Sequence, residues 1–474
     1  MNQASRTSSS EWQEHCSTHS EGPTLTPRDQ AVSSERSDSS ECLRVHPVRS
    51  LKGDYRLPGD KSISHRALLL GALSVGATDV QGFLPAADCL ASLRCVRGLG
   101  VRVDELSATH LVVHGQGPGG LREPEDVLDC GGSGTTMRLL AGILAAQPFF
   151  SVLTGNAQLR RRPMDRVAAP LRLMGAVVQG RKEGRLPPLC IAGRQLVGID
   201  YSLPVASAQV KSAILLAGLW ATSPTTVREP GPARDHTERM LRARGAALEC
   251  DGRGTVFLTP GQELRATDVV VPADMSSTAF LMVAACLTPD SEITLRDVGV
   301  NPTRSGVLDV LLEMGADIRL MNQREVGGEP LADLVVRSSG LRGVEIGGAM
   351  IPRLIDEIPI LALAAAQAEG RTVIRDAAEL RVKETDRIET TAAELRRLGA
   401  HIETRPDGLL IEGPTPLHGA RVSSHGDHRL AMTLAVAGLT AEGETLVEDT
   451  ACIADSFPGF ENVLQEATET HAQN

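Results

Sequence analysis

Lysine is rare in this sequence, and its few positions mark places where chemistry could occur. Only five of the 48 basic residues are lysine, namely Lys52, Lys61, Lys182, Lys211 and Lys383. A chain that uses arginine for ordinary positive charge keeps lysine where it needs a compact ammonium that can lose its proton. Lys52 and Lys182 lie in polar stretches, so chance survival explains them. The other three are candidates for a chemical role.

Two acid-containing segments accompany one of these lysines. Segment 383–387 reads KETDR and comes just before a predicted helix, and Asp356 and Glu357 begin another one. A network of i,i+4 ion pairs would explain 383–387 as a structural feature. An acid–base group would explain why a lysine is kept there. We favour the acid–base interpretation.

The other unusual residues lie where apolar helices are predicted to begin. These openings combine glycine, serine or aspartate with lysine or arginine, and they are segments 59–66, 131–138, 207–212, 356–357 and 427–429. Helix N-termini carry unpaired N–H groups and a partial positive charge, so they bind anions. Capping by serine or aspartate explains any one opening, but not the recurrence of basic residues and glycine. The pattern predicts one site for more than one anionic group.

The helices that carry these openings recur about every 70 residues, which indicates an internal repeat. Six apolar stretches begin near Ser62, Ser133, Ser207, Ser276, Asp356 and Asp427. Each is apolar on nearly all faces, which predicts buried helices. A second helix in five copies is predicted to end at a glycine in the left-handed C-cap position, namely Gly100, Gly175, Gly245, Gly315 and Gly399. With β-favouring segments between the helices, the sequence predicts an α/β fold of six units in two domains of three.

Composition limits the classes of partner and compartment. The 474-residue chain has a formal net charge of −11, which disfavours nucleic acid and anionic membranes as partners. It has no apolar run of roughly 18 residues, the length a membrane-spanning helix needs. Nine scattered cysteines without a CxxC pair indicate reduced thiols, and hence a cytoplasmic protein. Residues 1–42 are polar and acidic, so we expect them to be disordered; their acids disfavour the alternative, a transit peptide.

Three weaker signals do not define a site on their own. Segment 131–136 resembles a phosphate-binding loop but lacks the Gly-Lys-Ser/Thr ending. His425 and His428 have no companion ligand cluster, so we expect no metal. Segment 160–162 is three arginines, which alone would indicate a solvated face.

Taken together, the motifs resemble those of the 5-enolpyruvylshikimate-3-phosphate (EPSP) synthase family, from about residue 43 to 466. The matching segments are LPGDKSISHRAL from Leu57, GGSGTTMRLLAG from Gly131, RRRPMDRV from Arg160, SAQVKSAILLAGL from Ser207, RDHTERML from Arg234, IDEIPILALAAA from Ile355, RVKETDRI from Arg381, GDHRLAM from Gly426 and SFPGF from Ser456. Within the family, SAQVKSA and RDHTE resemble the class II branch. The resemblance implies a two-domain inside-out α/β barrel of six βαβαββ units, three per domain. The first domain would span 58–272, the second would combine 43–57 with 273–474, and the active site would lie between them.

The resemblance also implies roles for individual residues. Binding of shikimate 3-phosphate is implied for Lys61, Ser62, Arg66, Ser207, Ala208, Gln209 and Arg234. A phosphoenolpyruvate pocket, where the inhibitor glyphosate would also bind, is implied for Lys61, Gly134, Arg162, Gln209, Arg387 and Arg429. Acid–base chemistry is implied for Asp356, Lys383, Glu384 and Lys61, with His428 beside them in the substrate site. Asp356 is the candidate base for the 5-hydroxyl of shikimate 3-phosphate, and Glu384 or Lys61 is the candidate acid for the methylene carbon of phosphoenolpyruvate.

The implied enzyme is a transferase of chorismate and aromatic amino acid biosynthesis. It would join its two substrates by addition and elimination, release phosphate, and use neither a metal nor an organic cofactor. We expect a monomer whose partners are these two small molecules. Two positions depart from the family pattern. Gly132 stands where an asparagine is usual. Asp455 stands where class I enzymes have a substrate-binding lysine, and class II enzymes lack that lysine as this chain does. Each departure puts one substrate contact in doubt.

Three other functions fit the sequence less well. The related transferase that acts on UDP-N-acetylglucosamine lacks the DKSISHR and RVKETDR runs and uses a loop cysteine that has no evident counterpart here. A non-catalytic paralogue would not need Lys61, Asp356, Lys383 and Glu384 together. A nucleic-acid end-processing enzyme of related fold is disfavoured by the acidic balance.

Overall fold

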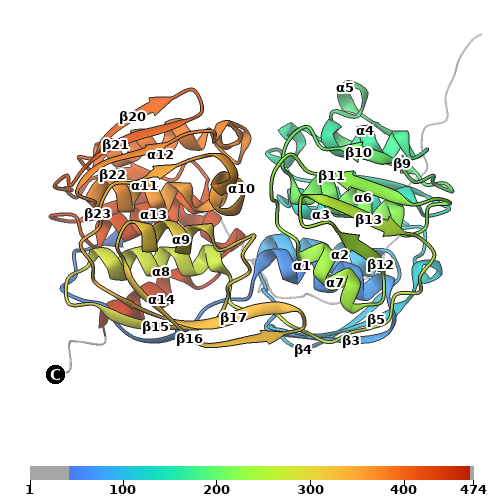
Figure 1. The fold of residues 1–474 in the computed structure, drawn as a ribbon, viewed down its shortest axis with the longest axis horizontal. Helices are drawn as coiled ribbons and strands as arrows, with labels where there is room; N and C mark the ends of the chain where they lie inside the picture. Colours follow the sequence, from blue (N-terminus) through green and yellow to red (C-terminus); the bar gives the residue numbers. More distant parts are fainter. Residues whose placement is uncertain (1–41, 470–474) are drawn as a thin grey trace, which may run out of the picture. The chain divides into compact units, whose positions relative to one another are not determined.

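A computed structural model describes residues 42–469, which form an α/β fold with six sheets (Figure 1). Five sheets have four strands and one has three. In each sheet an edge strand pairs in parallel and the remaining pairs are antiparallel. The same pairing pattern therefore recurs in all six sheets.

The strands of the six sheets, each sheet in spatial order, have the following bounds. The first sheet consists of β14 (Val269–Val270), β3 (Val75–Gln81), β5 (His110–Gln116) and β4 (Arg102–Ser107). The second consists of β6 (Leu128–Asp129), β7 (Phe150–Thr154), β9 (Leu186–Ala192) and β8 (Val177–Gly180). The third consists of β10 (Asp200–Ser202), β11 (Thr225–Arg228), β13 (Thr255–Thr259) and β12 (Ala247–Cys250). The fourth sheet consists of β16 (Asp317–Val326), β17 (Glu329–Arg337), β15 (Glu292–Gly299) and β2 (Lys52–Arg56). The fifth consists of β18 (Glu345–Ile346), β19 (Gly370–Ile374), β21 (Gly408–Gly413) and β20 (His401–Arg405). The sixth consists of β1 (Cys42–Val45), β23 (Thr445–Glu448) and β22 (Arg421–Ser423).

The six buried helices predicted from the apolar stretches are present. They are α1 (Lys61–Leu73), α3 (Gly134–Ala145), α6 (Ala208–Gly218), α8 (Met275–Leu287), α11 (Ile358–Gln367) and α13 (His428–Gly438). Two of them, α1 and α8, begin just before the serines near which the apolar stretches start, and aspartates cap them. The Asp60 carboxylate accepts from the Ile63 N–H, and the Asp274 carboxylate accepts from the Ser276 N–H.

The predicted second helices are present as well. They are α2 (Ala87–Gly98), α4 (Asp165–Leu173), α7 (His236–Ala243), α9 (Gly306–Glu313) and α12 (Arg387–Arg397). The glycine predicted to close each of them has a positive φ, between 84° for Gly100 and 105° for Gly399. A side chain at these positions would be strained, which explains why the sequence repeats glycine there.

The apolar residues pack into two hydrophobic cores. One consists of residues between Ile63 and Val271, and the other combines residues 45–57 with residues 273–467. The chain passes between the cores twice, and the two passages are hydrogen-bonded to each other: the Asp60 N–H donates to the Pro272 carbonyl (2.7 Å), and the Asp274 N–H donates to the Pro58 carbonyl (3.0 Å). Helices α1 and α8 both begin at this crossing, where the residues that cap them are held together.

The start of the described chain corrects one predicted boundary. Cys42 belongs to β1, which pairs with β23 from Cys42–Glu448 to Val45–Thr445, so it is not part of a disordered tail. The rest of the predicted tail lies outside the described residues.

Within 42–469, no helix is both long and apolar enough to cross a membrane. In the same range, no group of three or more His, Cys, Asp or Glu side chains is arranged to hold a metal ion.

Candidate active site

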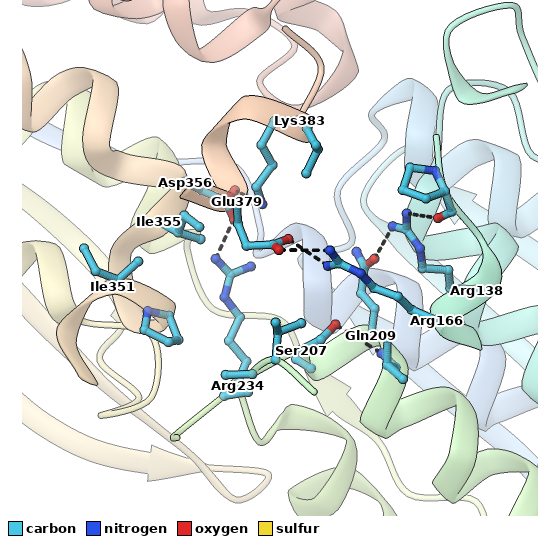
Figure 2. Close-up of a pocket in the computed structure, with 18 of the residues that line it drawn as sticks. Arg138, Arg166, Ser207, Gln209, Arg234, Ile351, Ile355, Asp356, Glu379 and Lys383 are labelled. Atoms are coloured by element: carbon cyan, nitrogen blue, oxygen red, sulfur yellow. Dashed lines mark hydrogen bonds and ion pairs between the residues drawn. The ribbon is translucent and has the colours of Figure 1, made fainter. Parts of the chain in front are cut away.

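A cavity of about 390 Å³ opens among the beginnings of several helices and turns (Figure 2). Its walls include the predicted site residues Arg162, Ser207, Ala208, Gln209, Arg234, Asp356 and Lys383. Arginine side chains approach it from one side and the turn that carries Asp356 from the other. A cavity of this size with arginine and lysine around it suits small polyanionic ligands.

Asp356 is the charged centre of this cavity. It lies in the 3-10 turn η4 (Ile355–Glu357) that precedes α11. Its carboxylate accepts from Arg234 (2.6 Å), Lys383 (3.2 Å) and Arg387 (3.4 Å). Burial disfavours its charge, but these cations and Arg429 outweigh burial and hold its pKa well below the usual range. Asp356 is therefore a carboxylate that can accept a proton once some of its partners are drawn to a ligand.

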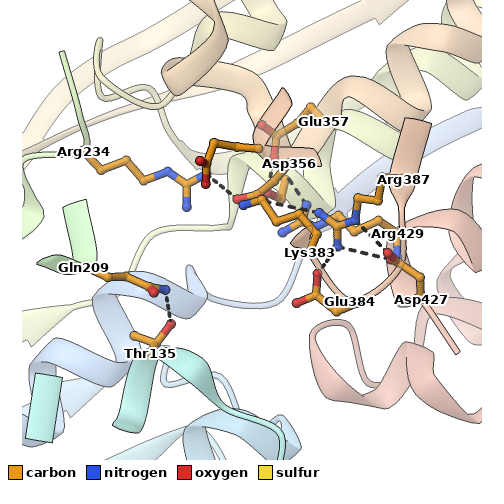
Figure 3. Close-up of polar contacts among 12 residues, drawn as sticks. Thr135, Gln209, Arg234, Asp356, Glu357, Lys383, Glu384, Arg387, Asp427 and Arg429 are labelled. Carbon is orange, nitrogen blue, oxygen red and sulfur yellow. Dashed lines mark hydrogen bonds and ion pairs between the residues drawn. The ribbon is translucent and has the colours of Figure 1, made fainter. Parts of the chain in front are cut away.

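Glu384 lies beside this group, next to Arg387 (Figure 3). Its carboxylate accepts from Arg387 (2.7 Å) and from Arg162 (3.3 Å). Burial opposes ionisation, but Arg387 and Arg162 prevail and keep its pKa well below the usual range. Arg387 is fixed in turn by Asp427, whose carboxylate lies 2.7 Å from its Nε. Glu384 is therefore ionised near pH 7, so it can act as an acid only after its arginines acquire another anion.

Arg429 is held by a fully buried carboxylate. Glu357 accepts from Arg429 (3.3 Å) and from Arg304 (2.9 Å), and it also accepts from the Ser276 hydroxyl. Arg304 reaches Asp274, the residue that caps α8, at 3.0 Å. The beginnings of α8, α11 and α13 are thereby joined by one ion-pair network.

Lys61 begins α1 and points toward two different segments. Its Nζ lies 2.6 Å from the Asp88 carboxylate and 3.2 Å from the Asp455 carbonyl. Burial opposes its charge, but Asp88 outweighs burial and raises the pKa of Lys61. Burial also lowers the pKa of His428 to about 3, with Lys61 contributing, so this imidazole is neutral near pH 7. The Lys61 ammonium is thus charged near pH 7, and it can donate a proton only when a stronger base approaches.

Gly134 opens α3 directly under two guanidinium groups. A Cβ at this position would lie 2.9 Å from Arg138 Nη1 and 3.3 Å from Arg162 Nη1. Arg138 donates to the Gln209 side-chain carbonyl (2.5 Å), and the Gln209 amide donates to Thr135 (2.9 Å). The beginnings of α3 and α6 are therefore connected at the cavity wall.

Arg66 and Ser62 lie deeper than the cavity residues. Arg66 is 3% exposed, and its guanidinium donates to the hydroxyl groups of Thr237 (2.7 Å) and Ser212 (3.0 Å) and to the Ser62 carbonyl (2.9 Å). Of the predicted site residues, Lys61, Ser62, Arg66, Gly134, Glu384, Arg387, His428 and Arg429 do not line the cavity itself. Arg162, Arg387 and Asp356 connect several of them to it through the ion pairs described above.

Several residues at the site were not identified from the sequence. They are Asp88, Arg166, Arg304 and Glu379, whereas Arg138, Glu357 and Asp427 lie in helix openings that the sequence singled out but received no individual role. Arg138 lies one helical turn after Gly134, and that i,i+4 spacing could have predicted it. The bidentate pair of Arg166 with Glu379 (2.8 and 3.0 Å; Figure 2) carried no such signal, because 213 residues separate its members.

The two positions that depart from the family pattern have defined surroundings. A Cβ at Gly132 would lie 3.2 Å from the Asn156 amide nitrogen and 3.7 Å from Asp88. Burial and the nearby Asp88 raise the pKa of Asp455 to about 6, with Lys61 opposing them. The backbone carbonyl of Asp455 therefore accepts a hydrogen bond from Lys61, whereas its surroundings disfavour the ionised form of its side chain.

Comparison with known proteins identifies the family to which this fold belongs. A sequence model of the family described as EPSP synthase (3-phosphoshikimate 1-carboxyvinyltransferase) matches residues 45–464. A 3-phosphoshikimate 1-carboxyvinyltransferase of Desulforudis audaxviator is 57% identical over 422 residues, which are 89% of this chain and 98% of that protein. The enzyme of the same name from Geobacter sulfurreducens is 56% identical over 424 residues, covering 90% of this chain and 98% of the relative.

Solved structures give the same result. An EPSP synthase from Acinetobacter baumannii superposes with a TM-score of 0.82 at 46% identity, covering 90% of this chain and 98% of that one. At this identity and coverage, both the fold and the family are shared. The chain belongs to the EPSP synthase family.

Proposed function

We propose that this member of the EPSP synthase family transfers the enolpyruvyl group of phosphoenolpyruvate to the 5-hydroxyl of shikimate 3-phosphate. The observation that supports this most directly is the position of Asp356. It is a partly buried carboxylate held by Arg234, Lys383 and Arg387 at the wall of an arginine-lined cavity. The two substrates each carry a phosphate and a carboxylate, which match bidentate arginines.

The ion pairs suggest how substrates prepare the acid and the base. If the shikimate 3-phosphate anion draws Arg234 away, Asp356 loses one of its cations and its pKa rises, which makes it a better base for the 5-hydroxyl. If phosphoenolpyruvate engages Arg162 and Arg387, Glu384 loses counter-charge and gains an anionic neighbour. Its pKa then rises as well, which suits it to protonate the methylene carbon.

The reaction balances without another reagent. The 5-oxygen bonds to C2 of phosphoenolpyruvate, its proton passes to the base, and the acid gives a proton to C3. The tetrahedral intermediate then loses a proton from C3 and expels phosphate from C2, which restores the enol ether double bond. Positioned acids and bases each contribute about 100- to 10,000-fold. Lys61, beside Asp88, would contact both substrates and is the alternative acid.

The proposal includes the domain division and the remaining binding residues. Domains of 58–272 and of 43–57 with 273–474 are supported by the two hydrophobic cores. An inside-out barrel of six units is supported by the six buried helices and the recurring sheet pattern.

Shikimate 3-phosphate would be bound by Ser62, Arg66, Ser207, Ala208 and Gln209. Gly134 and Arg429 would border phosphoenolpyruvate, and His428 would lie beside them. The chain would act as a monomer. A cytoplasmic location is supported by seven free cysteines among the described residues, namely Cys89, Cys95, Cys130, Cys190, Cys250, Cys286 and Cys452.

The test is phosphate release by the purified protein. Release is expected only when phosphoenolpyruvate and shikimate 3-phosphate are both present, and not when UDP-N-acetylglucosamine replaces the latter. Asp356→Asn keeps the size of the side chain but removes the base, so it should reduce turnover by at least about 100-fold. Release that depended on UDP-N-acetylglucosamine, or full activity of Asp356→Asn, would contradict the proposal.

A further inference from the structure

Lys211 is buried with two carboxylates, a group that the proposed chemistry does not use. The lysine lies in α6 with 1% of its side chain exposed, and its Nζ contacts Glu238 in α7 (2.5 Å) and Glu229 just after β11 (2.8 Å). The second oxygens of both carboxylates are buried without a hydrogen-bond partner among the described residues. Such a group is costly unless its members stay paired, so Lys211 holds three separate segments at one point.

The residue adjacent to each helical member of this group connects the group to the site. Ser212 follows Lys211 in α6, and Thr237 precedes Glu238 in α7. Their hydroxyl groups are 2.6 Å apart, and both accept from the Arg66 guanidinium. Any shift of α6 against α7 would therefore separate the two acceptors of Arg66, whose third partner is the carbonyl at the start of α1.

We propose that Lys211 is a positioning residue for the binding of shikimate 3-phosphate. By drawing Glu229 and Glu238 together, it fixes the start of α6, which carries Ser207–Gln209, relative to Arg66 and to the segment that carries Arg234. The inference rests on the proposed role of these elements in binding that substrate. Lys211 lies behind them and does not touch the cavity.

The electrostatics of the group agree with this role. Burial opposes the charge of Lys211, but Glu238 and Glu229 outweigh burial and raise its pKa. Glu238 also favours the charged form of Arg66, although burial and the neighbouring Arg234 lower the pKa of Arg66 to about 10. Glu238 thus lies within electrostatic reach of both cations. A compact ammonium can donate to carboxylates from different directions, which a planar guanidinium cannot do equally well; this explains a lysine in an arginine-rich chain.

The experiment compares Lys211→Met with Arg244→Met. Arg244 directly follows α7 and is also buried (2% exposed), but among the described residues its guanidinium donates to the carbonyls of Met240 and Thr267 and to no partner of Arg66. Both substitutions are expected to lower Tm. Lys211→Met should raise KM for shikimate 3-phosphate about tenfold, the scale of one lost charged hydrogen bond. It should raise KM for phosphoenolpyruvate less than about threefold, and Arg244→Met should change neither constant.

Two further variants separate the possible failures. If Lys211→Met does not fold, the triple variant with Glu229→Gln and Glu238→Gln removes every charge of the group and should fold while keeping the raised KM. A KM for shikimate 3-phosphate that is unchanged in the folded Lys211 variants, or raised equally by Arg244→Met, would overturn the inference. Arg66→Met measured in parallel tests the underlying assignment: if its KM for shikimate 3-phosphate is unchanged, the assignment of Arg66 fails, and with it the route proposed for Lys211.

Discussion

At the scale of single residues, the type of each charged side chain follows from the partners it must hold. Lys383 donates to Asp356 at 3.2 Å, and the same carboxylate also accepts from arginines. Burial lowers the pKa of Lys383, with Arg387 adding to this effect, although Asp356 opposes it. Only a lysine could release its proton usefully in such a place, because a guanidinium does not deprotonate in proteins.

Lys383→Arg should therefore be damaging although the charge is kept. We expect turnover to fall by at least about tenfold, since the larger guanidinium cannot donate from the same point or lose its proton. Lys52→Arg is the matched control, because Lys52 is exposed at the beginning of β2 and should tolerate arginine. Steady-state kinetics of both variants provide the measurement, and equal turnover in the two would remove Lys383 from the catalytic group.

Asp455 allows a prediction about stability and pH. Its folded pKa of about 6 is above the ordinary value of 3.8, so the folded protein binds the proton more tightly than the unfolded chain. The carboxylate therefore destabilises the fold increasingly as pH rises from about 4 to about 6, and fully above that range. Asp455→Asn should raise Tm at pH 8 and raise it less at pH 5. Thermal melts at the two pH values would contradict this if the gain were equal or larger at pH 5.

At the scale of elements, the first residue of α3 decides how closely a ligand can approach the helix. Gly134 has no Cβ, and the space in which one would lie is bordered by the guanidinium groups of Arg138 and Arg162. These are the ends of long side chains, so a methyl group would displace them rather than break the helix. Its effect should therefore appear in ligand binding more than in stability.

Gly134→Ala should raise the inhibition constant of glyphosate by a larger factor than KM for phosphoenolpyruvate. The proposed pocket would accommodate phosphoenolpyruvate, whereas the longer inhibitor would extend further toward the added methyl group. Gly119→Ala is the control, because a Cβ there meets no atom within 4 Å. Inhibitor titration in steady-state assays gives both constants. Equal changes in the two constants, or no change in either, would show that Gly134 does not face the ligand.

At the scale of the whole molecule, the chain completes its sheets with segments that are distant in sequence. β1, at the start of the described residues, pairs with β23, and β2 pairs in parallel with β15. The second hydrophobic core includes Val45, Leu51 and Leu57 from this early segment. The N-terminal segment is thus part of the core that surrounds α8, α11 and α13.

Two truncations should distinguish tail from fold. Removing residues 1–41 should leave Tm and turnover nearly unchanged, because that segment is polar and poor in apolar residues. Removing residues 1–46 also deletes β1, exposes the edge of β23 and takes Val45 from the core, so Tm should fall by several degrees. Thermal melts of both proteins decide the point, and a large loss in the shorter truncation would show that the tail contributes to the fold.

The sequence by itself determined the helices, their ends and the family. Stretches that are apolar on nearly all faces predicted six buried helices, and glycine predicted where the second helices end because a positive φ favours it. Capping by serine or aspartate was predicted without a choice between the two, and the structure shows that Asp60 and Asp274 cap α1 and α8. All of these signals act over one or two helical turns.

Only the tertiary structure decided which charges meet. Arg166 and Glu379 are 213 residues apart, Arg234 and Asp356 are 122 apart, and Arg304 and Glu357 are 53 apart. No local pattern marks such pairs, because any arginine can satisfy any carboxylate and the choice depends on which helix beginnings the two cores bring together. Lys211 shows the same limit: its scarcity as a lysine indicated a role, but its partners Glu229 and Glu238 became known only once α6, α7 and β11 were in place.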